Sequence, residues 1–360
     1  MPLLNRSVRL AAALLFTLLG ACTTLPTQEF AAYKDAFAKA RMAGEEVLVD
    51  HAALRAQRAE LETRASLAAG AKPPPRVVPF KPEEIMLAGQ AVDHVAVRFR
   101  AWEVVARYNE ALTRLAEGKS SQDVVSAVDG LVQSLSDFPL DEIQGLATSI
   151  APLRIIIAEA ERERSRQEFL EVLAKGSPLI KDHFIKLLRD DTGDFRNLKL
   201  GLNTLQYNPL LRQVGREVRR CETLANAHAQ TEPMTGLRNG INAALMRLPT
   251  DQAERSPVPA MTYTAAKETV PFTPFAQNAL QQCKDGVDDA VERALAKHAE
   301  MVAYDEVLKA YLVLLSKVAG SLTAVEEAAR KSTPSAPPSR ELLGAFITLR
   351  QTLLSLRTKE

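Results

Sequence analysis

The stretch Thr27–Ala69 reads TQEFAAYKDAFAKARMAGEEVLVDHAALRAQRAELETRASLAA, and it carries a stripe of residues that recur at alternating steps of three and four. The stripe consists of Phe30, Tyr33, Phe37, Ala40, Gly44, Val47, His51, Leu54, Arg58, Leu61, Ala65 and Ala68. Such a seven-residue repeat is typical of helices that supercoil left-handedly around their neighbours. The sequence therefore predicts one long helix here, on the order of 60 Å at 1.5 Å per residue.

Small and polar residues within this stripe add detail to the prediction. Ala40 and Gly44 would allow a partner helix to approach closely, because neither carries a bulky side chain. His51 lies on the same stripe, and Asn109 lies near the stripe of the next predicted helix. We interpret both as packed or register-setting polar residues, since single polar groups in helical seams commonly fix register.

The rest of the chain repeats the helical pattern between proline-rich connections. Prolines cluster in Lys72–Pro82, Pro249–Pro274 and Pro334–Pro338, and proline disrupts helix interiors. Gly176-Ser177-Pro178 indicates the end of one helix and the start of another. Further helices are expected at about 83–117, 120–135, 140–174, 179–228, 236–247, 274–330 and 340–357. The 179–228 segment is expected to be interrupted at Asp191–Asp194 and to have a kink or a boundary at Pro209. The apolar stripe of the 274–330 segment consists of Leu280, Val287, Val291, Leu295, Val302, Leu308, Leu312, Leu315 and Val318. With no strand-rich region and no internal repeat, we expect an all-α fold, an extended bundle of long, partly coiled-coil-like helices.

The N-terminal residues have the features of a secretory signal. Arg6 and Arg9 precede the apolar run Leu10–Leu19, and small residues follow it. The run is about half the roughly 20 residues that a membrane-spanning helix needs. The next residues, Leu19-Gly20-Ala21-Cys22, resemble the lipobox of bacterial lipoproteins.

This resemblance implies a lipid anchor at Cys22. In that family the cysteine thiol is alkylated with diacylglycerol, the chain is cut before it, and the new amino terminus is acylated. Thr23 stands where an aspartate would resemble an inner-membrane retention signal, so the resemblance implies the periplasmic face of the outer membrane. The alternative is a soluble secreted protein that is cut after Ala21 and keeps an unmodified Cys22.

These features predict a linear division of the chain. We expect a signal peptide at 1–21, a lipidated tether at 22–26, an N-terminal helical bundle at 27–174, a C-terminal helical region at 175–330, and a Pro/Ser linker with an amphipathic terminal helix at 331–360.

Composition narrows the classes of partner. The 45 basic and 44 acidic residues leave a formal net charge of +1, which argues against nucleic-acid binding. Two further cysteines, Cys221 and Cys283, would reach an oxidising compartment after secretion. We expect them to form one disulfide, the alternative being two buried, unreactive thiols.

Motifs for metals, cofactors or catalysis are incomplete. Gly118-Lys119-Ser120 resembles the tail of a phosphate-binding loop, but Thr113 stands where that loop needs glycine. Asp190, Asp191 and Asp194 do not have the spacing of an EF-hand. The histidines are scattered at His51, His94, His183, His228 and His298. We therefore expect no metal, no cofactor and no catalytic residues.

Three functional hypotheses remain from the sequence. The first is a non-enzymatic, membrane-anchored scaffold or adaptor for another envelope protein, held to the membrane by its N-terminal lipid. The second is a membrane-active helical protein that binds or remodels lipid, because the terminal segment Arg340–Arg357 is basic and amphipathic. The third is a periplasmic ligand binder or hydrolase with an inter-helical cleft. The oligomeric state is left open.

Overall fold

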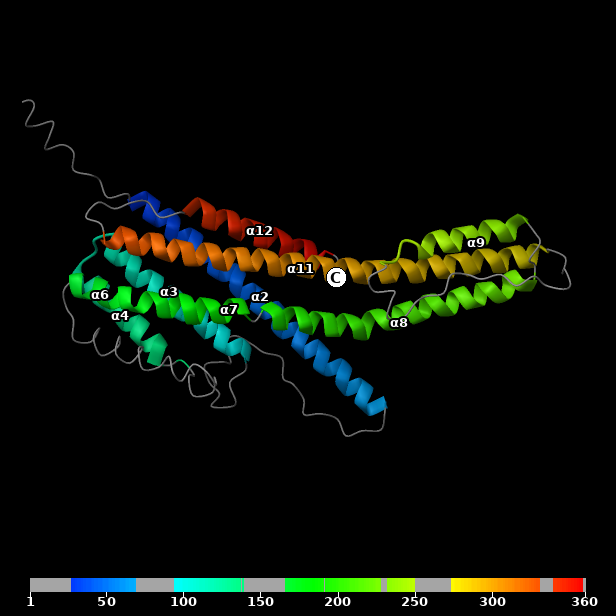
Figure 1. Ribbon diagram of the computed structural model, residues 1–360, viewed down its shortest axis with the longest axis horizontal. Helices are drawn as coiled ribbons and strands as arrows, with labels where there is room; N and C mark the ends of the chain where they lie inside the picture. The colour runs from blue at the N-terminus through cyan, green and yellow to red at the C-terminus, as the bar shows by residue number, and fades with distance from the viewer. Residues whose placement is uncertain are drawn as a thin grey trace, which may run out of the picture. The chain divides into compact units, whose positions relative to one another are not determined.

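The computed structural model describes residues 27–68, 94–136, 138, 166–190, 192–227, 232–249, 273–330 and 339–358. All regular structure in these ranges is helical, and no strand occurs among them (Figure 1). The predicted all-α fold class is therefore confirmed. Cys22 and the predicted helical segments at 83–93 and 140–165 lie outside the described residues.

The described helices agree closely with the periodicity of the sequence. They are α2 (Thr27–Ala68), α3 (His94–Ala116), α4 (Ser121–Ser136), α6 (Arg166–Leu179), the π-helical η3 (Ile180–Ile185), α7 (Lys186–Asp190), α8 (Thr192–Ala227), α9 (Glu232–Leu245), α11 (Pro274–Arg330) and α12 (Ser339–Arg357). Helix α11 has the bounds that its apolar pattern predicts, and α2 ends one residue before the predicted end.

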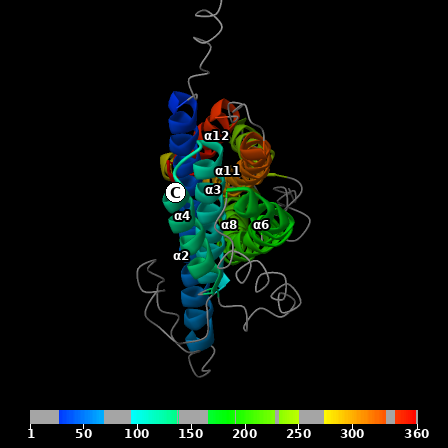
Figure 2. The same ribbon diagram turned by 90° about the vertical axis from the view of Figure 1, so that its left-hand side faces the viewer.

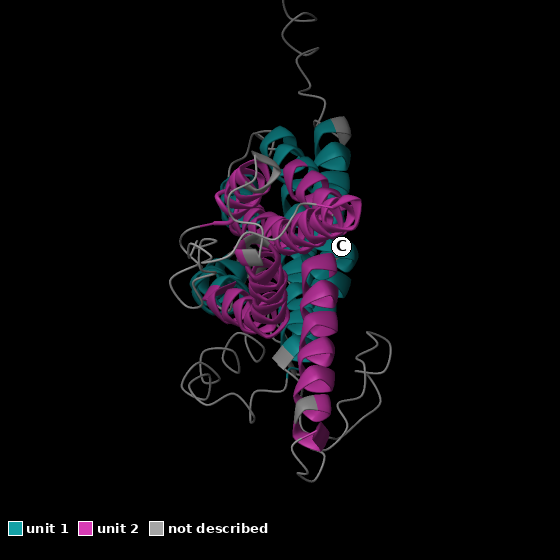
Figure 3. Cartoon of the chain, turned by 90° about the vertical axis from the view of Figure 1, so that its right-hand side faces the viewer, with its two compact units in different colours: residues 1–45, 88–189, 313–347 teal, residues 46–87, 190–312, 348–360 magenta. Residues whose placement is uncertain are grey.

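The chain divides into two compact units (Figure 3). Unit 1 comprises residues 1–45, 88–189 and 313–347, and unit 2 comprises 46–87, 190–312 and 348–360. Helices α2, α11 and α12 each contribute residues to both units. The units therefore have other boundaries than the linear segments 27–174 and 175–330 expected from the sequence, because the long helices do not end where a unit ends.

Unit 1 is built around the first part of α2 and the indole of Trp102. The predicted stripe is buried here, with Phe30, Tyr33 and Ala40 fully inaccessible to solvent. Helix α3 packs against α4 and α6 (Figure 1, Figure 2). Between α3 and α4 the chain turns through Gly118, whose φ of 67° favours glycine.

The predicted helix break at Gly176-Ser177-Pro178 is wrong. Helix α6 continues through Pro178 to Leu179, and the chain then forms the π-helical η3 before α7. Proline removes one backbone donor and crowds the carbonyl four residues earlier, and a π-helical segment is a known local adjustment of a helix. Burial of Ile180, Phe184 and Ile185 supports this continuous path, because all three side chains pack into the core of unit 1.

Unit 2 has a core formed by α8, α9 and the first part of α11. Its members include Val214, Val218, Ile241, Val287 and Val291. Helix α8 runs through Pro209, so this proline does not form the boundary that the sequence also allowed. A disulfide between Cys221 and Cys283, with their Cα atoms 5.7 Å apart, joins α8 to α11 inside this core.

Helices α11 and α12 both have apolar surfaces of the kind that membrane-associated helices carry. Among the described helices, α11 contains an 18-residue window with a mean hydropathy of 1.4, long and apolar enough to cross a membrane. Half of that window is buried within the protein, and core helices meet the same criterion. The apolar side of α12 is also buried, with Leu342, Leu349 and Leu353 at most 1% exposed.

Candidate functional site

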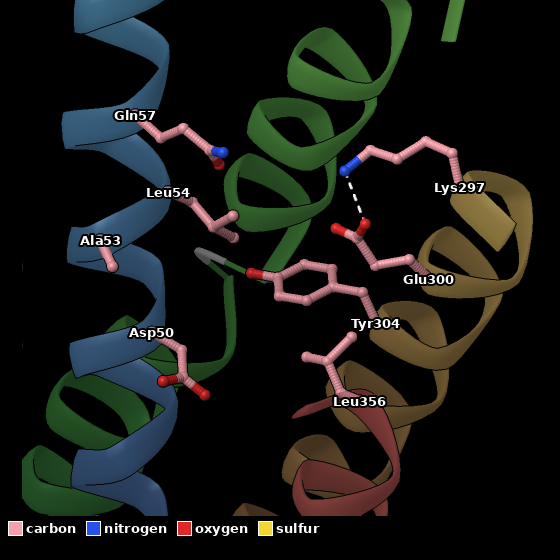
Figure 4. A pocket seen from close by; sticks show the side chains of 8 residues that line it. All are labelled: Asp50, Ala53, Leu54, Gln57, Lys297, Glu300, Tyr304 and Leu356. Carbon is pink, nitrogen blue, oxygen red and sulfur yellow. Dashed lines mark hydrogen bonds and ion pairs between the residues drawn. The ribbon is translucent and has the colours of Figure 1, made fainter. Parts of the chain in front are cut away.

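A cavity of about 360 Å³ lies in unit 2 between α2, α11 and α12 (Figure 4). Its lining consists of Asp50, Ala53, Leu54 and Gln57 from α2, Lys297, Glu300 and Tyr304 from α11, and Leu356 from α12. Positions three, four and seven apart share one face of a helix, which explains how each long helix presents its residues to the same space. The wall therefore combines charged, polar and apolar groups.

Glu300 is the electrostatic centre of one wall. Its carboxylate accepts hydrogen bonds from Lys199 on α8 and from Lys297 one turn earlier on α11, the latter at 2.5 Å. Burial by itself raises the pKa of Glu300, but the hydrogen bonds from the two lysines outweigh burial and hold the pKa below its usual value. Glu300 is therefore a carboxylate at neutral pH, bonded on both oxygens.

Tyr304 lies one turn further along α11 and points its hydroxyl toward α2 (Figure 4). The residue is 2% exposed, and within the described part of the chain its hydroxyl has no hydrogen-bond partner. Burial raises the pKa of this phenol, and the carboxylates of Asp50 and Asp305 raise it further. The phenol therefore stays neutral and keeps a proton to donate. The Lys199 ammonium lies 5.4 Å from the ring centroid and holds the ring by a cation–π contact.

Asp50 forms the opposite charged end of the cavity. Arg357 on α12 donates to Asp50 at 3.3 Å and to Glu46, one turn earlier on α2, at 2.6 Å. Arg357 thus pairs with two carboxylates, of which Asp50 lines this end of the cavity. Chemically, the cavity can donate from Lys297 and Tyr304 and can accept at Asp50.

A pair of stacked rings connects α2 with α8. The imidazole of His51 lies 3.8 Å from the ring of Phe195, centroid to centroid, and is 5% exposed. The interpretation of His51 as a packed polar residue is confirmed by this burial.

The other motifs singled out from the sequence do not converge on the cavity. Cys22, the expected lipid attachment residue, lies outside the described residues. Gly118-Lys119-Ser120 forms the turn between two helices, where Ser120 accepts a hydrogen bond from the backbone of Asp123 at 3.2 Å. Cys221 and Cys283 are bonded to each other elsewhere in unit 2. Among the described residues, no group of three or more His, Cys, Asp or Glu side chains could hold a metal ion.

Sequence reasoning missed the residues that form the cavity. Lys199 and Glu300 are 101 residues apart, so their pairing leaves no local pattern in the sequence. One signal was present, since Lys297, Glu300 and Tyr304 have helical spacing on the buried side of α11, where charged residues are uncommon.

No protein-family model matches the chain, and no curated protein or solved structure is significantly similar to it. What the cavity can do chemically is therefore inferred only from the contacts of the residues that line it.

Proposed function

We propose that this protein is a lipid-anchored protein of the bacterial outer membrane whose helical body serves as a non-enzymatic scaffold or adaptor for another envelope protein. The sequence Leu19-Gly20-Ala21-Cys22, placed after a basic start and a short apolar run, carries this proposal. Helix α2 begins at Thr27, so the tether 22–26 spans roughly 18 Å at most when fully extended. The anchor would hold the start of α2 close to the bilayer.

Exposed apolar side chains provide positions for a partner. Phe275 at the start of α11 is 84% exposed, and Met246 just beyond α9 is 85% exposed. Large apolar residues are enriched in the contacts that dominate protein interfaces, so these two are the first positions to probe.

The anchor is tested by replacing Cys22 with serine, which cannot carry the thioether-linked lipid. We expect wild-type cells to show a processed, palmitate-labelled protein in the outer membrane, and the Cys22→Ser protein to be unlabelled and unprocessed. Cys283→Ser is the matched control and should keep the label. A Cys22→Ser protein that is processed normally and still sediments with the outer membrane would refute the anchor.

The adaptor role is tested by photo-crosslinking in intact cells. A benzophenone side chain at Phe275 or Met246 should give one discrete adduct with an envelope protein, whereas the same group at the exposed Lys309 should not. Absence of an adduct at both apolar positions would contradict the adaptor role.

Of the two alternative functions, the cavity favours ligand binding. The membrane-active alternative would require the apolar side of α12 to leave its buried position. Leakage of a trapped dye from phosphatidylethanolamine–phosphatidylglycerol vesicles on adding the protein would favour that alternative over the scaffold.

A further inference from the structure

We propose that the cavity beside Tyr304 binds a short peptide of two or three residues with free amino and carboxyl termini. This inference goes beyond the scaffold role and does not depend on the lipid anchor, because every residue that carries it lies in unit 2.

The first argument is the hydroxyl of Tyr304. A buried hydroxyl without a partner is unfavourable, and native proteins leave few such groups unsatisfied. This hydroxyl is buried, has no partner within the described residues and is aimed into the cavity (Figure 4). A ligand that places a carbonyl oxygen beside it would accept its proton. Peptide bonds offer such carbonyls.

The second argument is the charge at each end of the cavity. At one end, the ammonium groups of Lys199 and Lys297 both pair with the carboxylate of Glu300. At the other end, the carboxylates of Asp50 and Glu46 both pair with Arg357. Figure 4 shows Lys297 and Asp50 at opposite ends, with Tyr304 between them. A zwitterion matches this pattern, with its carboxylate toward Lys297 and its ammonium toward Asp50.

The third argument is length. On α11 the step from Lys297 to Tyr304, and on α2 the step from Asp50 to Gln57, each cover seven residues, about 10 Å along a helix. A free amino acid separates its two charges by one carbon, which is too short to reach both ends. Two or three extended residues cover about 7–10 Å, which matches the span.

Apolar residues complete the fit. Leu54 and Leu356 also line the cavity and would contact the ligand's side chains. Gln57, at the end near Lys297, offers an amide that can donate to and accept from a peptide bond. A volume of about 360 Å³ suits small side chains such as alanine.

The experiment uses isothermal titration calorimetry on the purified full chain in detergent at neutral pH and low salt. Tri-alanine is the probe, and we expect saturable binding of one peptide per chain. N-acetyl-tri-alanine amide lacks both charges and should bind at least about ten-fold more weakly. Glucose and inorganic phosphate are titrated in the same way, to test whether the cavity binds a neutral polyol or an anion instead. The proposal is overturned if tri-alanine does not bind, if the blocked peptide binds equally well, or if glucose or phosphate binds more tightly.

Variants then place the binding in this cavity. Tyr304→Phe should weaken tri-alanine binding about five-fold without lowering the free energy of unfolding, because the hydroxyl has no partner among the described residues. Tyr311→Phe removes a hydroxyl from another buried tyrosine of α11 that does not line the cavity, and should leave binding unchanged. Unchanged binding in Tyr304→Phe would overturn the assignment.

The end of the cavity at Lys297 is tested with variants in the same binding experiment. Lys297→Met should weaken the binding of tri-alanine about ten-fold and leave the binding of N-acetyl-tri-alanine amide unchanged. Lys284→Met, elsewhere on α11, is the matched control. Gln57→Leu changes an exposed side chain that is not part of the core. The variant should therefore keep the fold and bind tri-alanine more weakly. Wild-type affinity in both Lys297→Met and Gln57→Leu would contradict the proposed orientation.

Discussion

Gly44 of α2 lies against the indole of Trp102 of α3, and a Cβ atom placed on Gly44 would lie well under 3.0 Å from Cζ2 of the ring. No real Cβ atom is found at such a distance, so the glycine is required by the packing of the tryptophan rather than by backbone conformation. Trp102 is completely buried and is the largest fully buried side chain of the described residues. The close approach expected at Gly44 from the sequence is confirmed at this contact.

Replacing Gly44 with alanine should therefore destabilise unit 1. The added methyl group would displace the indole, and overpacking of this kind lowers the free energy of unfolding by about 1–3 kcal/mol. Urea denaturation followed by the fluorescence of the single tryptophan measures the effect. Gly320→Ala is the control, because no atom of the described residues lies within 4 Å of its added Cβ and a helical alanine should gain up to about 1 kcal/mol. Equal effects of the two substitutions would show that the Trp102 contact is not tight.

The disulfide should supply a large part of the stability of unit 2. Cys221 and Cys283 are 62 residues apart in sequence, and closing a loop of that length stabilises a fold by about 4 kcal/mol in the chain-entropy description. We expect the double variant Cys221→Ala/Cys283→Ala to lose that amount in urea denaturation. Dithiothreitol should lower the wild-type midpoint to that of the variant and leave the variant unchanged. A wild-type midpoint that is insensitive to reduction would show that the bond is absent.

The Lys199–Glu300 pair should make stability depend on pH in the acidic range. The pKa of Glu300 is below its ordinary value of 4.5 in the folded protein, so the unfolded chain takes up the proton at a higher pH. The stabilisation is present above about pH 4.5 and is lost as the pH falls through the lower, folded-state pKa. At pH 7, Glu300→Gln should lower the free energy of unfolding by about 3 kcal/mol, because it leaves a buried ammonium poorly compensated.

Comparing wild type with Glu300→Gln over a range of pH isolates this effect. The difference in the free energy of unfolding should shrink from pH 7 toward pH 3. Glu341→Gln, which removes the exposed partner of Lys317, should produce a much smaller difference at every pH, because solvent screens exposed pairs. A difference for Glu300→Gln that does not change with pH would argue against the paired carboxylate.

The buried hydrogen bond from Tyr33 to Asn109 should stabilise unit 1. The Tyr33 hydroxyl donates to Asn109 Oδ1 at 2.5 Å, while Ser321 Oγ lies 3.4 Å away. Asn109→Ala should lower the free energy of unfolding by about 1–3 kcal/mol, since it leaves a buried hydroxyl without its close partner. The double variant Tyr33→Phe/Asn109→Leu removes both polar groups and should recover part of the loss. A double variant less stable than Asn109→Ala would show that packing, rather than the hydrogen bond, is the main contribution.

Helix α6 shows where local signals fail. Gly176 and Pro178 are strong local indicators of a helix end, yet the helix continues because its neighbours bury Ile180 and Phe184. The predicted stripe on α11 also included Val302, which is 49% exposed, whereas Tyr304 is buried. Over a helix of this length, a small error in the assumed period rotates the predicted face away from the real one.

From the sequence alone it follows that this protein is helical, that α11 runs from Pro274 to Arg330, and that the stripe residues between Phe30 and Leu54 face a core. These properties follow from periodicity along one helix, which depends only on neighbours in the chain. The pairing of Lys199 with Glu300, the pairing of Arg357 with Asp50 and the cavity that the Tyr304 hydroxyl faces arise only when distant helices pack together. Those relationships depend on which distant faces pack together, and helical periodicity carries no information about the identity of the opposing helix.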